Sequence, residues 1–470
     1  MKEGKNTKGM IDRRTFLKGT GILTAAAVTG LPVLSAKKTW AKKQFSGITI
    51  DYWNQINVQN RLVKVAVEEA VKDFENETGA KVNVSWHGYG DIIGPKYRTN
   101  FRAGVRPTIF DSDMEWAGAI RKYLLPLNDF IKNDLDKDIR EAIKWMDPYL
   151  ADMDRCWPDK DKFVTMVLWS NICNPLCTRV DHWKKAGISF EDNWPIRSYE
   201  HFIEICQRFK KAGVTDYPTE VYGATFDAGD CGLPCWVVGK DRLKGTFFNN
   251  DCTDINVDSD VWLGTIQEYV DVFRKYNLSS PRSPKSGDEN AAEEIALGKK
   301  SLVDIEYSNR GILMDRAGDL LKNGTIQWGP HFTGASGSIG NFHIWSFHLV
   351  RQEGTDADVK EQCAWELLKF LLRPEYQIKI AKPLGSLPLR QDVWDQLKGT
   401  PERLFEAHIE MLKTKPRVWS SHPLQVDVQY NKFGPRMSNI LNGKDLHAEI
   451  DAYCKEIRES LGTFSIKEYL

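Results

Sequence analysis

Hydrophobic positions along the chain recur at two different spacings, and each spacing predicts a kind of element. Residues 60–77 carry apolar side chains three and four positions apart, the spacing of an amphipathic helix, and Gly79 is expected to end it. Runs rich in β-branched and aromatic residues predict strands at 47–53, 81–86 and 107–111, with a helix at 98–103. This alternation of strands and helices predicts parallel sheets covered by helices.

The same two patterns continue through the rest of the chain. We expect a strand in the apolar run 163–173, a helix at 201–212, strands at 301–306 and 342–350, a helix at 362–373, and mostly helix from 402 onward. Residues 279–287, rich in Pro and Ser, are expected to form an exposed loop. A length of 470 residues is too great for one ordinary core, so at least two domains are expected.

Composition narrows the class of protein. Hydrophobic residues make up 41% and charged residues 27%, as in a globular protein, which excludes wholesale disorder and a multi-span membrane protein. The chain has 64 basic and 64 acidic residues and therefore lacks the basic excess of a general nucleic-acid binder. It also has 16 tryptophans, whose large flat rings build cores or line ligand clefts.

The first 41 residues have the pattern of an export signal. A basic start is followed by the uncharged stretch 19–36 and a small-residue end. Residues 12–18 read Asp-Arg-Arg-Thr-Phe-Leu-Lys, which resembles the twin-arginine signal. We expect cleavage near Ala41, or alternatively near Ala36, and a plain secretory signal with a chance arginine pair is the alternative interpretation.

Export predicts a free protein in the periplasm. The first cysteine is Cys156, far from the cleavage region where a lipid anchor would need one. Without residues 1–41 the chain loses eight basic and two acidic residues, which leaves an acidic excess of six. We expect a monomer with no membrane insertion and no nucleic-acid partner.

Nine cysteines leave the redox state of the chain open. At least one cannot pair internally because the number is odd. Cys173 and Cys177 form one C-x3-C pair, and Cys231 and Cys235 form another. Disulfides or buried free thiols are the favoured interpretation, and a zinc site made from the four thiolates is the alternative. We expect no metal and no cofactor.

Seven short segments, in order along the chain, resemble the carbohydrate-type solute-binding proteins of ABC importers. The first is Phe74-Glu-Asn-Glu-Thr-Gly-Ala-Lys-Val82, beside that family's F-E-x-x-T-G-x-x-V. The others are 101–109, 125–129, 296–301, 362–372, 385–393 and 440–444. One departure is Cys177-Thr178-Arg179, where Tyr-Asn-Lys is common, so ligand contacts cannot simply be copied.

The resemblance implies an architecture and a role. The fold would be α/β, a two-lobed periplasmic-binding-protein fold of type II with mixed sheets, covering helices and a ligand in the interlobe cleft. We expect one lobe from 45–160 plus about 300–345, and the other from 161–299 plus about 346–470. The protein would capture a carbohydrate or polyol by hinge closure and deliver it to the membrane subunits of an ABC importer.

Polar and aromatic residues that follow the predicted strands are the candidate ligand contacts, since sugars offer hydroxyls and apolar faces. Those residues are Trp53, Asn54, Tyr89, Asp113, Glu115, Trp116, Trp169, Asn171, Trp236, Tyr307, Ser308, Asn309 and Asn341. For each tryptophan the alternative is packing in the core. Trp262, Trp365 and Trp394 fall in helical patterns and are assigned to packing.

No catalytic residue is expected. The chain has no G-x-S-x-G, P-loop or H-E-x-x-H motif. The glycine-rich residues 334–340 could offer backbone N–H groups to a phosphate, which keeps a glycerol- or sugar-phosphate ligand open. Carboxylate pairs such as Asp111 with Asp113 leave a secreted carbohydrate-active enzyme as the less favoured alternative.

Overall fold

The computed structural model describes most of the chain after the export signal. The described residues are 44–55, 61–88, 95–159, 166–172, 175–224, 227–230, 232–306, 309–332, 334–337 and 341–469. All of them belong to one compact unit, residues 41–470. No helix among them is long and apolar enough to cross a membrane.

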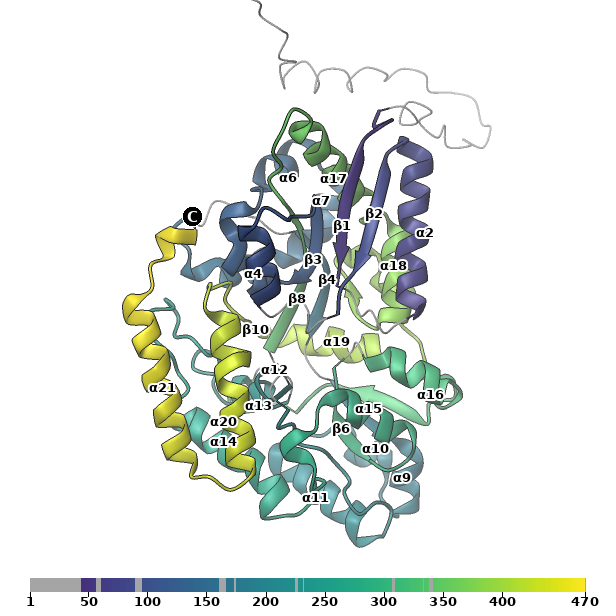
Figure 1. The fold of residues 1–470 in the computed structure, drawn as a ribbon. Coiled ribbons are helices and arrows are strands. Elements are labelled where there is room, and N and C mark those ends of the chain that lie inside the picture. The colour runs from purple at the N-terminus through teal and green to yellow at the C-terminus, as the bar shows by residue number, and fades with distance from the viewer. Residues whose placement is uncertain are drawn as a thin grey trace, which may run out of the picture. The chain divides into compact units, whose positions relative to one another are not determined.

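The larger of the two sheets contains seven strands in the order β2-β1-β3-β8-β4-β9, with β10 beside β8 (Figure 1). The strands are β1 (Thr49–Asn54), β2 (Lys81–Trp86), β3 (Ile109–Asp113), β4 (Met166–Ile172), β8 (Asn341–Leu349), β9 (Leu387–Pro388) and β10 (Arg417–Val418). β1 is parallel to β2 and β3, whereas β8 is antiparallel to β3 and β4. The sheet is therefore mixed, as the fold class requires.

Helices cover both faces of this sheet because successive side chains of a strand point to opposite faces. Tyr52 lies in one hydrophobic cluster with the apolar residues of α2 (Arg61–Thr78), whereas Trp53 packs in another with Tyr97 of α4 (Pro95–Arg102). The first face also carries α17 (Ala357–Leu371) and α18 (Pro374–Leu384). On the second face, α5 (Met114–Ala117) and the 3-10 helix η3 (Gly118–Tyr123) follow β3 directly.

A run of short helices connects η3 with β4. It consists of α6 (Asn128–Asp134), α7 (Lys137–Ile143), η4 (Lys144–Met146), α8 (Asp147–Met153) and η5 (Asp154–Cys156). α8 packs against β10 and so belongs with the larger sheet.

The smaller sheet has three strands in the order β6-β5-β7. They are β5 (Leu176–Arg179), β6 (Leu302–Asp304) and β7 (Ile326–Gly329), and β5 is antiparallel to both neighbours. The helices around this sheet are α9 (Val180–Lys185), α10 (Phe190–Asn193), α11 (Tyr199–Lys211), α15 (Asp288–Ala296) and α16 (Arg310–Lys322).

Strand pairing differs from the lobe boundaries expected for the second half of the chain. β6 and β7, which lie within 300–345, were expected with residues 45–160, but they pair with β5 in the smaller sheet. α17, expected with 161–299, packs on the larger sheet, and β8 runs across the boundary expected near residue 345 and lies wholly in that sheet. The physical reason is that pairing joins segments more than a hundred residues apart, which local periodicity does not encode.

The remaining helices complete the second lobe and return to the first. They are α12 (Asp227–Asp230), α13 (Leu233–Lys240), α14 (Asp260–Arg274), η6 (Ser283–Lys285), η8 (Gln391–Gln396), α19 (Leu404–Lys413), the π-helix η9 (Asp427–Phe433), α20 (Gly434–Leu441), α21 (Leu446–Thr463) and η10 (Ile466–Tyr469). α19 contacts β4 of the larger sheet and β7 of the smaller one, so it lies between the two sheets (Figure 1). η10 packs back on η3.

The Pro/Ser-rich segment 279–287 is largely buried, which corrects the expectation of an exposed loop. Ser280 and Ser283 donate hydrogen bonds to the carboxylate of Glu220 at 3.0 and 2.7 Å. That carboxylate also pairs with Lys300 Nζ at 2.5 Å, and both side chains of the ion pair are buried. The serine hydroxyls are therefore needed inside, because a buried ion pair is stable only when its remaining hydrogen-bonding positions are filled.

Candidate functional site

The carboxyl-terminal edges of the two sheets meet where the chain passes between them. β4 runs parallel to β3 and ends at Ile172, and β5 begins at Leu176 beside the last residue of β6 and the last of β7. Four residues of chain span at most about 14 Å even when fully extended. The end of β4 at Ile172 therefore lies within about 14 Å of Leu176, which pairs with the last residues of β6 and β7.

Asp111 organises the first of these edges. Its carboxylate accepts hydrogen bonds from Tyr52 Oη at 2.5 Å, from the backbone N–H of Gln55 at 2.7 Å and from Trp345 Nε1 at 3.2 Å. Asn54 donates to Tyr52 Oη at 2.6 Å. We call these five buried residues the strand-end cluster. Burial, and then the Asp111 charge, raise the pKa of Tyr52 well above its ordinary value, so the phenol stays a donor.

Aromatic rings cover the other face of the same edge. Trp53 is half-buried and stacks on Tyr97 with ring centroids 5.2 Å apart and 17° between the ring planes. His87, just past β2, lies 5.0 Å from the Trp53 ring, and Phe101 meets that ring edge-on at 6.4 Å. The ring of Trp53 is thus held rigidly while part of it remains accessible, as an aromatic platform for a ligand requires.

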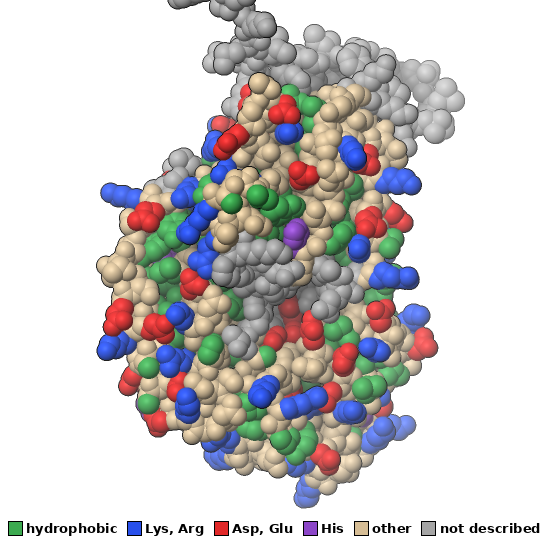
Figure 2. All heavy atoms as spheres, viewed as in Figure 1, with side chains coloured by type: hydrophobic (Ala, Val, Ile, Leu, Met, Phe, Trp, Pro, Cys, Tyr) green, Lys and Arg blue, Asp and Glu red, His purple; other side chains and the backbone are tan. Residues whose placement is uncertain are grey.

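Carboxylates gather at the facing edge of the smaller sheet. Asp304 ends β6, Asp288 begins α15, and Asp227 and Asp230 begin and end α12. We call these four residues the acidic cluster. Asn309 donates to Asp288 at 2.6 Å. Figure 2 shows acidic side chains in a recess near the middle of the face it displays.

Two members of the acidic cluster share a hydrogen bond between carboxyl groups. Burial raises the pKa of Asp227 to about 6. Burial, and then the charge of Asp227, raise the pKa of Asp288 well above its ordinary value. Asp288 therefore holds the proton that the two groups share, because two buried carboxylates in contact cannot both ionise readily.

The π-helix η9 connects the strand-end side of the site with the acidic cluster. Tyr430 donates to Asp230 Oδ1 at 3.2 Å, and its ring lies 6.0 Å from that of Trp116, which follows β3. Gln429 donates to the same carboxylate oxygen at 3.4 Å. A Cβ at Gly229 would clash with the carbonyl oxygen of Gln429, so glycine is what lets α12 approach η9. Tyr430 thus touches residues that belong to both lobes.

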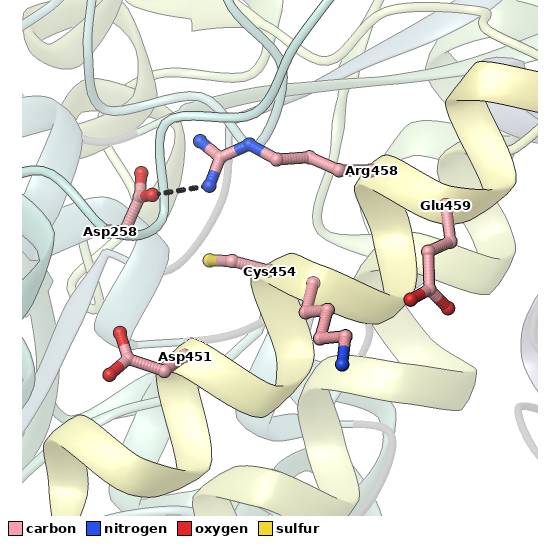
Figure 3. A pocket seen from close by; sticks show the side chains of 6 residues that line it. Asp258, Asp451, Cys454, Arg458 and Glu459 are labelled. Atoms are coloured by element: carbon pink, nitrogen blue, oxygen red, sulfur yellow. Dashed lines mark hydrogen bonds and ion pairs between the residues drawn. The ribbon is translucent and has the colours of Figure 1, made fainter.

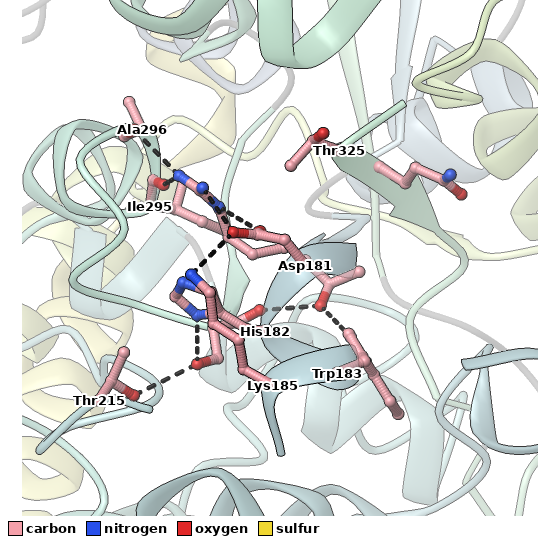
Figure 4. A network of polar contacts seen from close by, with 12 residues as sticks. Asp181, His182, Trp183, Lys185, Thr215, Ile295, Ala296 and Thr325 are labelled. Carbon is pink, nitrogen blue, oxygen red and sulfur yellow. Dashed lines mark hydrogen bonds and ion pairs between the residues drawn. The ribbon is translucent and has the colours of Figure 1, made fainter. Parts of the chain in front are cut away.

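A buried polar network fixes α15 at the end opposite to Asp288 (Figure 4). Arg179 donates to the carbonyls of Ile295 and Ala296 at 3.2 Å each, and forms a two-pronged ion pair with Asp181 at 2.9 and 3.0 Å. A cation at the last carbonyls of a helix is favourable. Arg179, which departs from the residue common in the family, therefore anchors the helix that carries Asp288.

The hydroxyls around Arg179 complete that network. Ser301 contacts His182 Nδ1 at 2.9 Å and Thr215 Oγ1 at 3.2 Å, while Thr178 accepts from Trp183 Nε1 at 2.8 Å (Figure 4). Burial lowers the pKa of His182 to about 4, so its ring is neutral near pH 7. The network is structural, and it gives the end of β5 a fixed geometry.

The structure shows one open surface pocket away from these clusters (Figure 3). It has a volume of about 530 Å³ and is lined by Asp258, Asp451, Cys454, Lys455, Arg458 and Glu459. Arg458 is paired with Asp258 at 2.7 Å and with Asp254 at 2.8 Å, so its charge is already neutralised. No residue of the strand-end or acidic cluster lines this pocket, and we do not assign the ligand to it.

The structure brings several of the predicted ligand contacts together. Trp53 and Asn54 lie at the end of β1, and Asp113 and Trp116 at the end of β3. Asn309 joins the acidic cluster through Asp288.

Trp236 is placed differently. It is 5% exposed and packs against Tyr199, Phe202, Tyr269 and Phe332 in the core of the second lobe. The packing assigned to Trp262, Trp365 and Trp394 is confirmed, since all three are buried.

Other predicted contacts lie partly or wholly outside the described residues. Tyr89, Tyr307 and Ser308 are outside them entirely. Of Glu115, Trp169, Asn171 and Asn341 the structure describes the backbone alone, which places them in α5, β4, β4 and β8. Their part in ligand binding stays a prediction.

Sequence reasoning missed the acidic cluster and Tyr430. Asp227 and Asp230 stand in an otherwise apolar, glycine-containing stretch, which is a weak signal for a functional loop. Tyr430 offered no signal, because it reaches Asp230 from 200 positions away along the chain.

The described residues hold no group of three or more His, Cys, Asp or Glu side chains placed to bind a metal ion. Six of the described cysteines carry free thiols: Cys156, Cys177, Cys206, Cys252, Cys363 and Cys454. Cys173 and Cys231, half of the thiolate set considered for zinc, lie outside the described residues.

Comparison with known proteins decides the family. The family model for bacterial extracellular solute-binding proteins matches residues 61–378. The chain belongs to this family. A second family model, for the twin-arginine translocation signal, matches residues 10–30 and confirms the predicted route of export to the periplasm. A search of curated proteins found no match.

Solved structures share the fold of this solute-binding protein. One is a solute-binding protein from Thermotoga lettingae bound to α-D-tagatose, with a TM-score of 0.69 and 16% identity over 88% of this chain and 100% of that one. Another, from Agrobacterium radiobacter in complex with ribitol, has a TM-score of 0.66 and 16% identity over 88% of this chain and 99% of that one. Maltose-bound MalE3 of T. maritima has a TM-score of 0.70 and 14% identity over 87% of this chain and 99% of that one. The two-lobed type II fold is thereby confirmed.

Proposed function

We propose that this solute-binding protein is a non-catalytic periplasmic receptor that captures a neutral carbohydrate or polyol between its lobes. The observation that carries the proposal is that buried carboxylates lie at strand ends of both sheets, and the β4–β5 crossing joins these sheets through at most about 14 Å of chain. The solved relatives in complex with tagatose, ribitol and maltose support the ligand class.

The chemistry of the two edges suits a ligand with many hydroxyl groups. Carboxylates accept hydrogen bonds from hydroxyls, and such bonds to charged groups contribute about 1.5–3 kcal/mol each. The accessible part of Trp53 offers a flat surface for the apolar face of a sugar ring. Trp116 is only 6% exposed and packs beside Tyr430, so it supports the site from within the core.

The arrangement of chain crossings supports closure by a hinge. β4 leads into β5, β7 leads back toward β8, and α19 contacts strands of both sheets. A ligand that contacts both lobes stabilises the closed form by its extra contacts there, and the membrane subunits of an ABC importer would recognise that form. We propose that the receptor acts as a monomer.

A phosphorylated ligand is disfavoured by the charges at the site. Four carboxyl groups form the acidic cluster, and the carboxylate of one of them, Asp304, lies 3.2 Å from the ring of His331. An added dianionic phosphate would be repelled by this cluster unless a cation accompanied it. We therefore place glycerol- and sugar-phosphates second to neutral ligands.

A glycosidase role for Asp111 with Asp113 is also disfavoured. The Asp111 carboxylate already accepts three hydrogen bonds from the protein, one of them from the phenol of Tyr52. The Asp111 carboxylate, engaged by these three hydrogen bonds, holds the strand ends in position. The protein is accordingly expected to leave its ligand chemically unchanged.

Titration calorimetry on the exported protein tests the proposal. The panel would contain monosaccharides, disaccharides, pentitols and hexitols, with glycerol phosphate and glucose phosphate as charged counterparts. We expect binding of a neutral member, recovered unchanged by chromatography. Binding of the phosphates alone would refute the ligand class, and turnover would refute the receptor role.

Two substitutions test where the ligand binds. Asp230→Asn should weaken binding about tenfold or more, because a hydrogen bond to a charged acceptor is lost. Asp451→Asn, in the surface pocket on α21, is the matched control and should leave the affinity unchanged. The reverse result would move the site to that pocket.

A further inference from the structure

Two cysteines from different parts of the fold lie with their thiols in contact. Cys156 ends η5, which follows α8 on the side of the larger sheet, and Cys252 lies in the turn between α13 and α14. The two thiols are hydrogen-bonded to each other.

The surrounding contacts hold this thiol pair in place. The segment around β10 lies between the two cysteines: Arg155 donates to the carbonyl of Val418 at 3.0 Å, and Arg417 donates to Asn250 at 2.7 Å. Cys252 itself has φ of 58°, in the left-handed region that residues other than glycine seldom adopt. Both backbones are thus fixed by several independent bonds, and the contact does not depend on a flexible loop.

The chemistry of the two sulfurs is unequal. The hydrogen bond from Cys156 and the charge of Arg155 lower the pKa of Cys252 to about 7, against the opposing effect of burial. Burial raises the pKa of Cys156 well above its ordinary value, so that thiol is the donor. A thiolate beside a thiol is the reactive arrangement of a dithiol, since the thiolate is the nucleophile.

Four other described thiols are inert by the same criterion. Burial raises the pKa of Cys363 and of Cys454 to about 12, and raises those of Cys177 and Cys206 too. Such buried thiols stay protonated and unreactive at neutral pH. The pair Cys156–Cys252 is therefore distinguished both by contact and by thiolate character.

We propose that Cys156 and Cys252 form a disulfide after export, joining the helical segment of the first lobe to the α13–α14 turn of the second. The twin-arginine route carries a folded chain from a reducing to an oxidising compartment, so the thiols meet an oxidant already in contact. The oxidant is a disulfide, of a small molecule or of a protein. Forming the bond brings the two sulfurs from hydrogen-bonding distance to about 2.05 Å.

The exchange balances in two steps. The Cys252 thiolate attacks one sulfur of the oxidant's disulfide, whose S–S bond breaks and releases one thiol, leaving a mixed disulfide on Cys252. The Cys156 sulfur, after losing its proton to solvent, attacks Sγ of Cys252 and displaces the second thiol. Two protein thiols are oxidised, and one oxidant disulfide is reduced to two thiols.

The exported protein, purified without reductant and then exposed to hydroxyethyl disulfide, tests this assignment. We expect two fewer cysteines to be alkylated after denaturation than in the dithiothreitol-treated protein, and a peptide that links residues 156 and 252 in the mass spectrum. Closing a loop of about 97 residues should raise the melting temperature by roughly 5 °C over the dithiothreitol-treated protein.

Variants separate this disulfide from other oxidation. Cys156→Ser and Cys252→Ser should each abolish the linked peptide and the shift in melting temperature, whereas Cys454→Ala should keep both. The proposal is overturned if as many thiols remain after oxidation as in the dithiothreitol-treated protein, if the link joins another pair, if Cys252 carries only a mixed disulfide, or if Cys156→Ser keeps the shift.

Discussion

A buried histidine in the helix between the two sheets gives a prediction that can be worked through from the structure. His408 lies on α19, has 0% of its surface exposed, and has no hydrogen-bond partner for either ring nitrogen among the described residues. Burial lowers the pKa of His408 to about 3, from 6.5 in an exposed ring. The ring is therefore neutral in the folded protein at any pH above that value.

The direction of the effect follows from proton binding. Between pH 6.5 and about 3 the unfolded chain binds a proton on His408 that the folded protein does not, so acidification favours unfolding. Each pH unit in this range is worth about 1.36 kcal/mol. Lowering the pH from 7 to 4.5 crosses two units below 6.5 and should cost about 3 kcal/mol through this residue alone.

The substitution His408→Leu removes that titration. Urea unfolding at pH 7 and at pH 4.5 gives the loss of unfolding free energy on acidification for each protein, and the loss should be about 3 kcal/mol smaller in the variant. Any change in packing at pH 7 cancels in this difference. Other buried histidines, such as His182, contribute equally to both proteins and cancel too.

His447, exposed on α21, is the matched control, and His447→Leu should leave the loss on acidification as it is in the parent. If His408→Leu loses as much free energy on acidification as the parent, the ring is solvated or hydrogen-bonded in the folded state. The argument from burial would then be wrong.

Three further predictions concern the site and its framework. Trp53→Ala should weaken ligand binding about tenfold or more, as measured by calorimetry. It should also lower the unfolding free energy by about 1–3 kcal/mol in urea unfolding, because the stack of Trp53 on Tyr97 is lost. Tyr430→Phe should weaken ligand binding by about tenfold while the fluorescence spectrum of the free protein changes little, because the ring remains and the hydroxyl that holds Asp230 is removed. Gly118→Ala should lower the unfolding free energy by about 2 kcal/mol or more in thermal unfolding, because its Cβ would clash with a backbone carbonyl. Gly264→Ala, in open space on α14, should raise the unfolding free energy by about 0.5–1 kcal/mol. Equal effects of the two substitutions would refute the clash.

The local pattern of hydrophobic residues alone predicted the helices and strands in which apolar side chains recur at a regular spacing. The expected strand 81–86 and helix 60–77 correspond to β2 and α2, each within one residue at either end, because helical and strand spacings are properties of neighbouring residues. The export signal at the start of the chain was readable for the same reason, since a short contiguous motif carries it. Trp262 was assigned to packing by its place in a helical pattern.

Tertiary structure decided which elements are partners. β6 and β7 joined the smaller sheet instead of the larger one, and residues 279–287 became a buried support for Glu220, although their composition is that of an exposed loop. These outcomes depend on pairing energies and on the solvation of a buried charge, both of which come from residues distant in the chain.

The candidate site shows the same division. Trp53 and Asn54 could be named from the sequence because they come directly after a recognisable strand. Tyr430, Asp230 and the thiol pair could not, because each gains its partner only when segments about a hundred to two hundred residues apart are folded together. Spacing along the sequence predicts the helix or strand to which a residue belongs, whereas the tertiary structure determines which distant residues it contacts.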